Sequence, residues 1–288
     1  MTAYRTPASV SITAEQLVKF GLEAGLTLDQ FKEAVANLVP SAVRELSVTN
    51  EFAAEEVESS YAYPKDYKVK GIAEQVATLR QLLPELKDAT FDEELAARPL
   101  PPNAELRAAI PKWETLAETY GEAVEKVLAA IKHQRTFTNC RDGQLGAEYL
   151  RQHEKTVKAW EKLGREQKGH DILVVAAQFG LRHKGRSVRR AREVMNAVEF
   201  GLGAFAVGIM LLTHPEREVQ RGQLHVDCAG DECAPDADGD FSGAPIFGWG
   251  DGRVKFSVGW LVGEGEFGAG SFDYTDGYCG SASAFLSQ

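Results

Sequence analysis

The sequence predicts an α+β protein with two regions, an α-helical region over residues 1–168 and a mixed region over residues 169–288. In the first region, apolar residues recur at the spacing of helices that bury one face. In the second, a β-branched apolar run begins at Asp171 and two helix-like segments follow it. After Pro215 only short strand-like pieces remain, separated by Gly, Asp and Ser.

Proline-rich breaks separate the expected helices of the first region. Thr27–Gln30 has the spacing of a capping box, and apolar residues follow it at helical intervals as far as Pro40. Arg98–Asn103 contains three prolines in four residues, which predicts a linker. Three further helices are expected, from about Ile72 to Leu83, Pro111 to His133 and Gln144 to Gln167.

The second region should begin with a buried strand, because Asp171–Phe179 is apolar, rich in β-branched residues and bounded by glycines. Two helices are expected next. The first, about Val188–Phe200, has Ser187 at its N-cap, and the second, Ala204–Thr213, ends before Pro215. Three strands should follow, at Gln223–Cys228, Arg253–Leu261 and Ser281–Leu286.

The formal net charge is −10, but six cations and no acid lie between Arg182 and Arg192. An acidic chain is a poor general nucleic-acid binder, since that binding grows with the number of phosphates neutralised. The basic segment could hold a phosphate at the start of the helix that follows Ser187. We favour the more common outcome, in which such a segment forms ion pairs with acidic neighbours.

Neither a membrane span nor a secretory signal is expected. The longest apolar stretch, Phe200–Leu212, is interrupted by three glycines and is shorter than a membrane helix requires. The N-terminus lacks the basic-then-apolar pattern of a signal peptide. We therefore expect a cytoplasmic protein, with surface display left open.

Two short motifs match binding patterns only in part. Gly201–Ala206 fits the dinucleotide-binding fingerprint, but a helix is expected before it where the fingerprint requires a strand, so we favour a helix joint. Asp236, Asp238 and Asp240 resemble the start of a calcium loop. Phe241 stands where an EF-hand loop needs glycine, so we favour an acidic surface loop and leave calcium open.

No metal, cofactor or catalytic residue is expected. The potential zinc ligands have a spacing that fits no common finger: His225, Cys228, Cys233 and Cys279. Four cysteines are also too few for a disulfide scaffold, so free and mostly buried thiols are expected. The histidines are scattered, and the chain has no nucleophile elbow.

The segment Asp240–Cys279 sets aromatic residues among Gly, Asp and Ser, the composition of binding surfaces on rigid scaffolds. We expect Phe247, Val254, Phe256 and Phe285 to lie in the core. The candidate ligand contacts are Ile246, Gly248, Trp249, Asp251, Ser257, Trp260, Phe272, Asp273, Tyr274, Asp276, Tyr278 and Cys279.

Three blocks of the second region resemble the variable proteins of diversity-generating retroelements, a bacterial group with near-constant blocks around a divergent segment. They read QFGLRHKGRSVRRAREVMNAVEFGLGAFAVGIMLLTHPE, LHVDCAGDECAPDADGDFSGAP and GSASAFLSQ. The resemblance covers about Ile172–Gln288. It implies a C-type lectin fold, in which the first and last strands pair, two helices lie between them, and a small, mainly antiparallel sheet carries the hypervariable region.

In that family, reverse transcription miscopies template adenines, so variable codons encode a restricted set of residues. From Ser257 to Cys279 only Trp260, Glu264 and Glu266 fall outside this set. The resemblance therefore implies non-catalytic binding of a variable protein ligand through protein–protein interaction, in an unspecified oligomeric state. Two alternatives are an enzyme with a glycine-rich site rim and a structural or assembly protein. The enzyme would need a perturbed His or Cys in a deep pocket, and assembly would need an apolar patch on the helical region.

Overall fold

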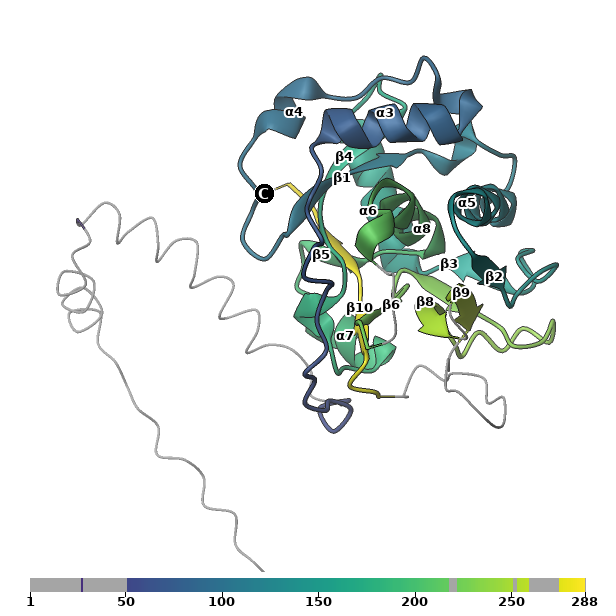
Figure 1. The fold of residues 1–288 in the computed structure, drawn as a ribbon. Helices are drawn as coiled ribbons and strands as arrows, with labels where there is room; N and C mark the ends of the chain where they lie inside the picture. The colour runs from purple at the N-terminus through teal and green to yellow at the C-terminus, as the bar shows by residue number, and fades with distance from the viewer. Residues whose placement is uncertain (1–26, 28–50, 218–221, 251–252, 259–274, 288) are drawn as a thin grey trace, which may run out of the picture. The chain divides into compact units, whose positions relative to one another are not determined.

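The computed structural model describes residues 27, 51–217, 222–250, 253–258 and 275–287. The chain consists of two compact units, Met1–Val48 and Thr49–Gln288. The described helices and strands belong to the second unit. This unit mixes helices with mainly antiparallel sheets, in agreement with the predicted α+β class. In Figure 1, α3 lies at one end of the unit and the second sheet at the other.

The first sheet is built around β4 and has the strand order β1-β4-β11-β5, with every pair antiparallel. Its strands are β1 (Leu106–Pro111), β4 (Ile172–Gln178), β5 (Glu199–Gly201) and β11 (Ser283–Phe285). All seven residues of β4 are buried, as the apolar run predicted. The closing strand β11 pairs with β4 in a register that places Ala284 opposite Ala177. The expected pairing of the first and last strands of the second region is therefore confirmed.

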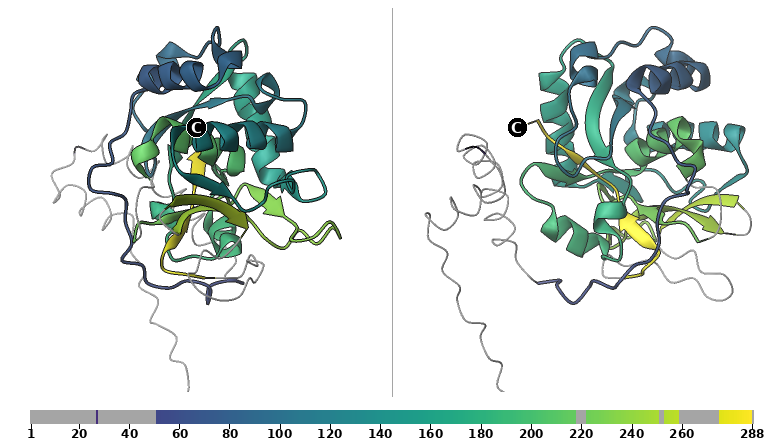
Figure 2. Two further views of the ribbon diagram at one scale, coloured as in Figure 1. Left: turned by 45° about the vertical axis from the view of Figure 1, so that its right-hand side comes forward. Right: turned by 60° about the vertical axis from the view of Figure 1, so that its left-hand side comes forward.

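The helices of the described residues are α3 (Ile72–Leu82), α4 (Glu93–Ala97), α5 (Tyr120–Gln134), α6 (Glu154–Glu166), α7 (Val188–Val194) and α8 (Ala204–Thr213). Every residue of α8 is buried, because α8 packs against α3, α5 and β1 (Figure 2). Gly208 permits the close approach of α5, since a Cβ there would lie 2.6 Å from Val127 Cγ1. None of the described helices is both long enough and apolar enough to cross a membrane.

Four 3-10 turns complete the helical structure: η1 (Pro84–Leu86), η2 (Trp113–Thr115), η3 (Leu181–His183) and η4 (Pro215–Arg217).

The second sheet has the strand order β10-β6-β8-β9-β2. Its strands are β2 (Phe137–Asn139), β6 (His225–Asp227), β8 (Pro245–Gly250), β9 (Arg253–Val258) and β10 (Cys279–Ser281). The β10–β6 and β2–β9 pairs are parallel, and the other two pairs are antiparallel. A separate pair joins β3 (Leu150–Gln152) to β7 (Asp231–Cys233). The expected core residues Phe247, Val254, Phe256 and Phe285 are all buried, which confirms that prediction.

Several expected helices are shorter in the structure. The helix expected from Pro111 begins at Tyr120, because Pro111 ends β1 and the capping box of Thr119 and Glu122 starts α5. The helix expected from Gln144 begins only at Glu154, after strand β3. The helix expected to reach Phe200 ends at Val194, and residues 199–201 join the first sheet as β5.

The expected helix at residues 27–40 lies outside the described residues apart from Thr27, whereas α3 and α8 match their predictions within one residue. Strands β1, β2 and β3 precede residue 168, and each pairs with a strand that follows it. Residues on both sides of the predicted boundary therefore share three sheets.

Candidate ligand-binding surface

The second sheet has an inner face against the core and an outer face, because side chains alternate along a strand. Phe247 and Phe256 belong to the inner face, where their ring centroids lie 4.9 Å apart. The register pairs Gly248 with Lys255 and Asp227 with Ile246, so these four residues belong to the outer face. Residues of β10 continue this face, since Ser281 lies opposite Asp227.

The predicted ligand contacts occupy different environments. Asp276 and Tyr278 are partly exposed beside β10, and Trp249 is half-buried on the inner side, where it packs against the core. Gly248 lies on the outer face but is buried. Ile246 and Cys279 have only 3% and 8% of their surface exposed, so we place them in the frame beneath the surface. The backbone of Ser257 belongs to β9, and the other predicted contacts lie outside the described residues: Asp251, Trp260, Phe272, Asp273 and Tyr274.

Tyr278 is the best defined aromatic residue of this surface. Its ring packs edge-on against the imidazole of His225, at 5.0 Å between centroids, and against the ring of Tyr61, at 6.1 Å. Its N–H donates to Asp276 Oδ1 at 3.2 Å, and its carbonyl accepts from the N–H of His225 at 2.7 Å. Rings and backbone together hold Tyr278 in one orientation at the edge of the sheet.

His225 is a neutral residue of this surface. Burial and, to a smaller extent, the charge of Arg217 lower the pKa of His225 to about 4, although Asp276 opposes the shift. The imidazole Nε2 accepts from the backbone N–H of Trp249 at 3.3 Å, which leaves the proton on Nδ1. This atom is buried and has no hydrogen-bond partner among the described residues.

Asp227 makes the charge of the surface sensitive to pH. Burial raises the pKa of Asp227 to about 7, and the nearby carboxylate of Asp276 adds to the shift. The carboxyl is therefore mostly protonated at pH 6 and mostly ionised at pH 8. A ligand that needs a negative charge here should bind more tightly at the higher pH.

The basic segment forms ion pairs with acids of the same chain, as we favoured. The carboxylate of Glu55 accepts from Ser187 Oγ at 2.6 Å and from Arg189 Nε at 2.8 Å. Arg186 and Arg190 both pair with Glu56. The position that a phosphate would take at the start of α7 is thus filled by the Glu55 carboxylate.

The Gly201–Ala206 motif follows a strand rather than the expected helix, because β5 directly precedes it. The start of α8 is nevertheless occupied. Asp231 Oδ2 accepts from the N–H of Ala204 at 2.6 Å, and Tyr120 Oη donates to the same carboxylate at 2.9 Å. A Cβ on Gly203 would lie only 2.2 Å from Asp231 Oδ1. The carboxylate therefore fills the position of a dinucleotide pyrophosphate.

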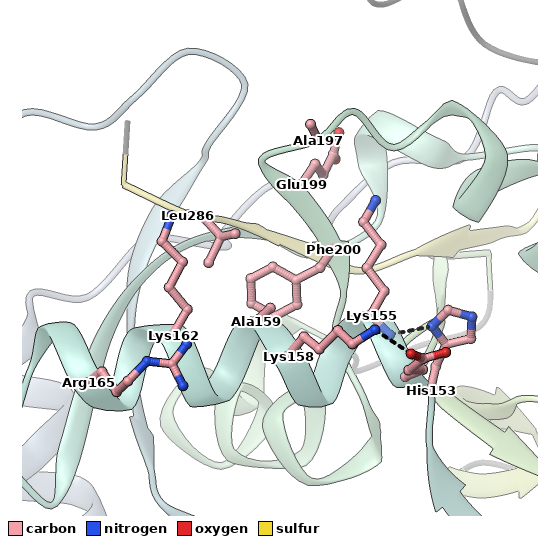
Figure 3. Close-up of a pocket in the computed structure, with 11 residues that line it drawn as sticks. His153, Lys155, Lys158, Ala159, Lys162, Arg165, Ala197, Glu199, Phe200 and Leu286 are labelled. Atoms are coloured by element: carbon pink, nitrogen blue, oxygen red, sulfur yellow. Dashed lines mark hydrogen bonds and ion pairs between the residues drawn. The ribbon is translucent and has the colours of Figure 1, made fainter.

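A pocket of about 440 Å³ lies beside α6. Figure 3 shows its lining, with Phe200 and Leu286 on the apolar side. The three outer cations pair with acids of the same helix: Lys158 with Glu154, Lys162 with Glu166 and Arg165 with Glu161. The ammonium of Lys155 donates instead to the carbonyls of Met195, at 3.3 Å, and Asn196, at 3.1 Å. Because the chain itself satisfies these charges, the pocket is a weaker candidate site than the partly exposed edge beside β10.

The histidine beside the basic segment does not line this pocket. His183 is fully buried, and its Nε2 lies 2.8 Å from Glu199 Oε1. Burial lowers the pKa of His183, although Glu199 opposes the shift. Burial also raises the pKa values of the Cys228 and Cys233 thiols well above the ordinary value. Such thiols are poor nucleophiles, since the thiolate is the reactive form.

Within the described residues, no three His, Cys, Asp or Glu side chains are grouped to hold a metal ion. The acidic loop is exposed, and its one described internal contact is the N–H of Asp240 with Asp238 Oδ1, at 3.1 Å. Cys228, Cys233 and Cys279 are buried, and Cys140 is exposed.

Comparisons with protein-family models, curated proteins and solved structures find no match to this chain.

Proposed function

We propose that this protein is a non-catalytic recognition protein with a C-type-lectin-like domain over residues 169–288, similar to retroelement variable proteins. Its ligand-binding surface is the partly exposed edge beside β10, with Asp276 and Tyr278, together with the predicted hypervariable segment. The ligand is another protein, bound by aromatic side chains and by short polar residues. The observation that carries this proposal is the antiparallel pairing of β11 with β4, which closes the domain with its own C-terminal strand.

The order of elements supports the proposal. After β4 come α7, β5 and α8, then four of the five strands of the second sheet (β6, β8, β9 and β10), and finally β11 beside β4. This is the order that the resemblance implies. The closing strand lies between β4 and β5, so the end of a variable segment is returned to a buried, hydrogen-bonded position.

The division between frame and surface supports a recognition role. The inner face of the second sheet is filled by Phe247, Val254 and Phe256, which are at most 1% exposed. Tyr278 and Asp276 lie at the edge, and both are partly exposed. A rigid frame lowers the entropy lost on binding, and Tyr offers a large contact area with few rotatable bonds.

A display library tests the proposal. We would randomise Asp251, Trp260, Phe272, Asp273 and Tyr274 and select variants against a panel of immobilised purified proteins. The expected result is that most members fold and that binders of different specificity emerge. A matched library at five buried frame positions should fail to fold: Ala177, Val226, Phe247, Phe256 and Ala284. If the first library folds as poorly as the second, or folds and yields no binder to any panel member, the proposal is wrong.

A further inference from the structure

Residues 51–63 precede α3 and form a turn followed by a segment without helix or strand, which we call the strap. Its acidic end is held by the basic segment. Glu55 receives hydrogen bonds from Ser187 and Arg189, and Glu56 pairs with Arg186 and Arg190. Burial would raise the pKa of Glu56, but the hydrogen bond from Arg190 and the charge of Arg186 outweigh it, and the pKa is lowered.

Backbone contacts reinforce this clamp. The N–H of Val57 donates to the carbonyl of Gly185 at 2.7 Å, and the N–H of Ser187 donates to the carbonyl of Glu55 at 3.1 Å. Gly185 has a φ of +73°, and a Cβ there would lie 2.1 Å from Val57 O. Only glycine fits this close approach at a left-handed backbone position.

The strap continues from the clamp to the candidate ligand-binding surface. Ser59 Oγ donates to the carbonyl of Gly277, and the ring of Tyr61 packs edge-on against Tyr278. The carbonyl of Ala62 accepts from the N–H of Leu224, the residue before β6. The strap therefore contacts the chain on two sides of Tyr278. One contact is at Gly277, the residue before Tyr278, and the other is at Leu224, just before the neighbouring strand β6.

A second path joins the clamp to the same place. The N–H of Gly185 donates to the carbonyl of Cys279 at 2.9 Å, and Lys184 forms a β-bridge with Gly280. Residues 184–186 thus lie between the strap and β10, with a further bridge from Arg186 to Glu56. The strap therefore braces the segment that supports β10 at its first residue.

We infer that the strap positions the Asp276–Cys279 part of the ligand-binding surface, with Glu55 and Glu56 as the clamp and with Ser59 and Tyr61 as the supports. The functional meaning of this inference rests on the proposed function. Its physical content does not, because it concerns the order of residues 276–279 in the free protein. The strap would be a constant part of the surface beside the variable residues.

Hydrogen exchange on the full chain tests the inference without any ligand. In the double variant Glu55→Gln/Glu56→Gln, peptides covering the strap and residues 276–282 should exchange faster by about tenfold to a hundredfold, which is the factor that loss of a charge-assisted hydrogen bond gives. Peptides of β4 should be unchanged. Glu58→Gln is the matched control, because Glu58 is an exposed strap glutamate without a described ion pair, and its exchange should equal that of the parent.

Two results would overturn the inference. Faster exchange in the strap with unchanged exchange at residues 276–279 would show that the strap does not position them. Unchanged exchange in the strap would show that the two glutamates are not its clamp. If β4 also loses protection in the double variant, Ser59→Ala/Tyr61→Ala decides, because it removes the contacts to Gly277 and Tyr278 and leaves the clamp intact. Faster exchange at residues 276–279 is then required, and unchanged exchange refutes the inference.

Discussion

Replacing Phe247 by Ala tests whether buried frame residues and surface residues of Asp240–Cys279 differ in their contribution to stability, although the composition of this segment does not distinguish them. The Phe247 side chain is fully buried, and its ring centroid lies 4.9 Å from that of Phe256. The ring also packs beside Gly208, where an added Cβ would lie 3.5 Å from Phe247 Cζ. Truncation of a buried Phe costs about 3 to 5 kcal/mol, and loss of an aromatic pair adds about 1 kcal/mol. The matched surface variant Tyr278→Ala removes a partly exposed ring and should cost about 1 kcal/mol.

Urea unfolding and thermal unfolding, both followed by circular dichroism, measure both variants on the full chain. For a unit of this size, 1 kcal/mol lowers Tm by about 2 to 4 °C, so Phe247→Ala should lower it by roughly 8 to 24 °C and Tyr278→Ala by a few degrees. The reasoning is refuted if Phe247→Ala costs under 1 kcal/mol. It is equally refuted if Tyr278→Ala is the more damaging of the two.

Four further substitutions test separate features of the structure. Asp231→Ala should cost about 2 to 4 kcal/mol in urea unfolding, because the N–H of Ala204 and the hydroxyl of Tyr120 lose their acceptor, and a cost below 0.5 kcal/mol would contradict that role. For Asp227 the folded pKa of about 7 lies above the ordinary 3.8, so its contribution to stability should fall as pH rises from 4 to 7, by on the order of 3 kcal/mol. The pKa of Asp231 is also raised to about 7, so Asp227→Asn should reduce the total slope by about half, and an unchanged slope would contradict the assignment. Gly280→Ala should lower Tm strongly, because its Cβ would lie 2.3 Å from Gly180 O, whereas Gly164→Ala in α6, with open space around it, should raise stability by about 0.5 to 1 kcal/mol.

The strongest local patterns predicted elements well. The apolar run at residues 171–179 became β4, and α8 has the bounds expected from its apolar residues and Pro215. Both β4 and α8 are wholly buried, so apolar residues are favoured at nearly every position of each element. The pairing of β11 with β4 was predicted from the resemblance, since nothing in the sequence of either strand alone specifies its partner.

The elements that the sequence did not predict depend on distant partners. Strands β2, β3 and β5 have three residues each, and only the strands beside them make them extended. Residues 106–111 form β1 opposite β4, although their composition suits a linker or a helix start equally well.

The sequence predicted the composition of the candidate site but not the burial or the neighbours of its individual residues. The alternation of strand faces puts Ile246 and Trp249 on opposite sides of β8, but it does not predict that Ile246 is buried and Trp249 only half-buried. The contribution of Tyr61 was missed, because it reaches Tyr278 from more than two hundred positions away in the sequence. A reciprocal charge pattern, two glutamates at 55–56 and arginines at 186–190, was the available signal for the strap.

Sequencing the 3′ end of this gene from many cells of one population would examine the diversification idea at its source. The proposed function predicts that differences between cells gather in the codons for residues 246–278, at adenines of a nearby near-identical repeat, while the codons of β4, α8 and β11 stay constant. Differences spread evenly over all these codons, or placed at bases other than template adenines, would contradict it.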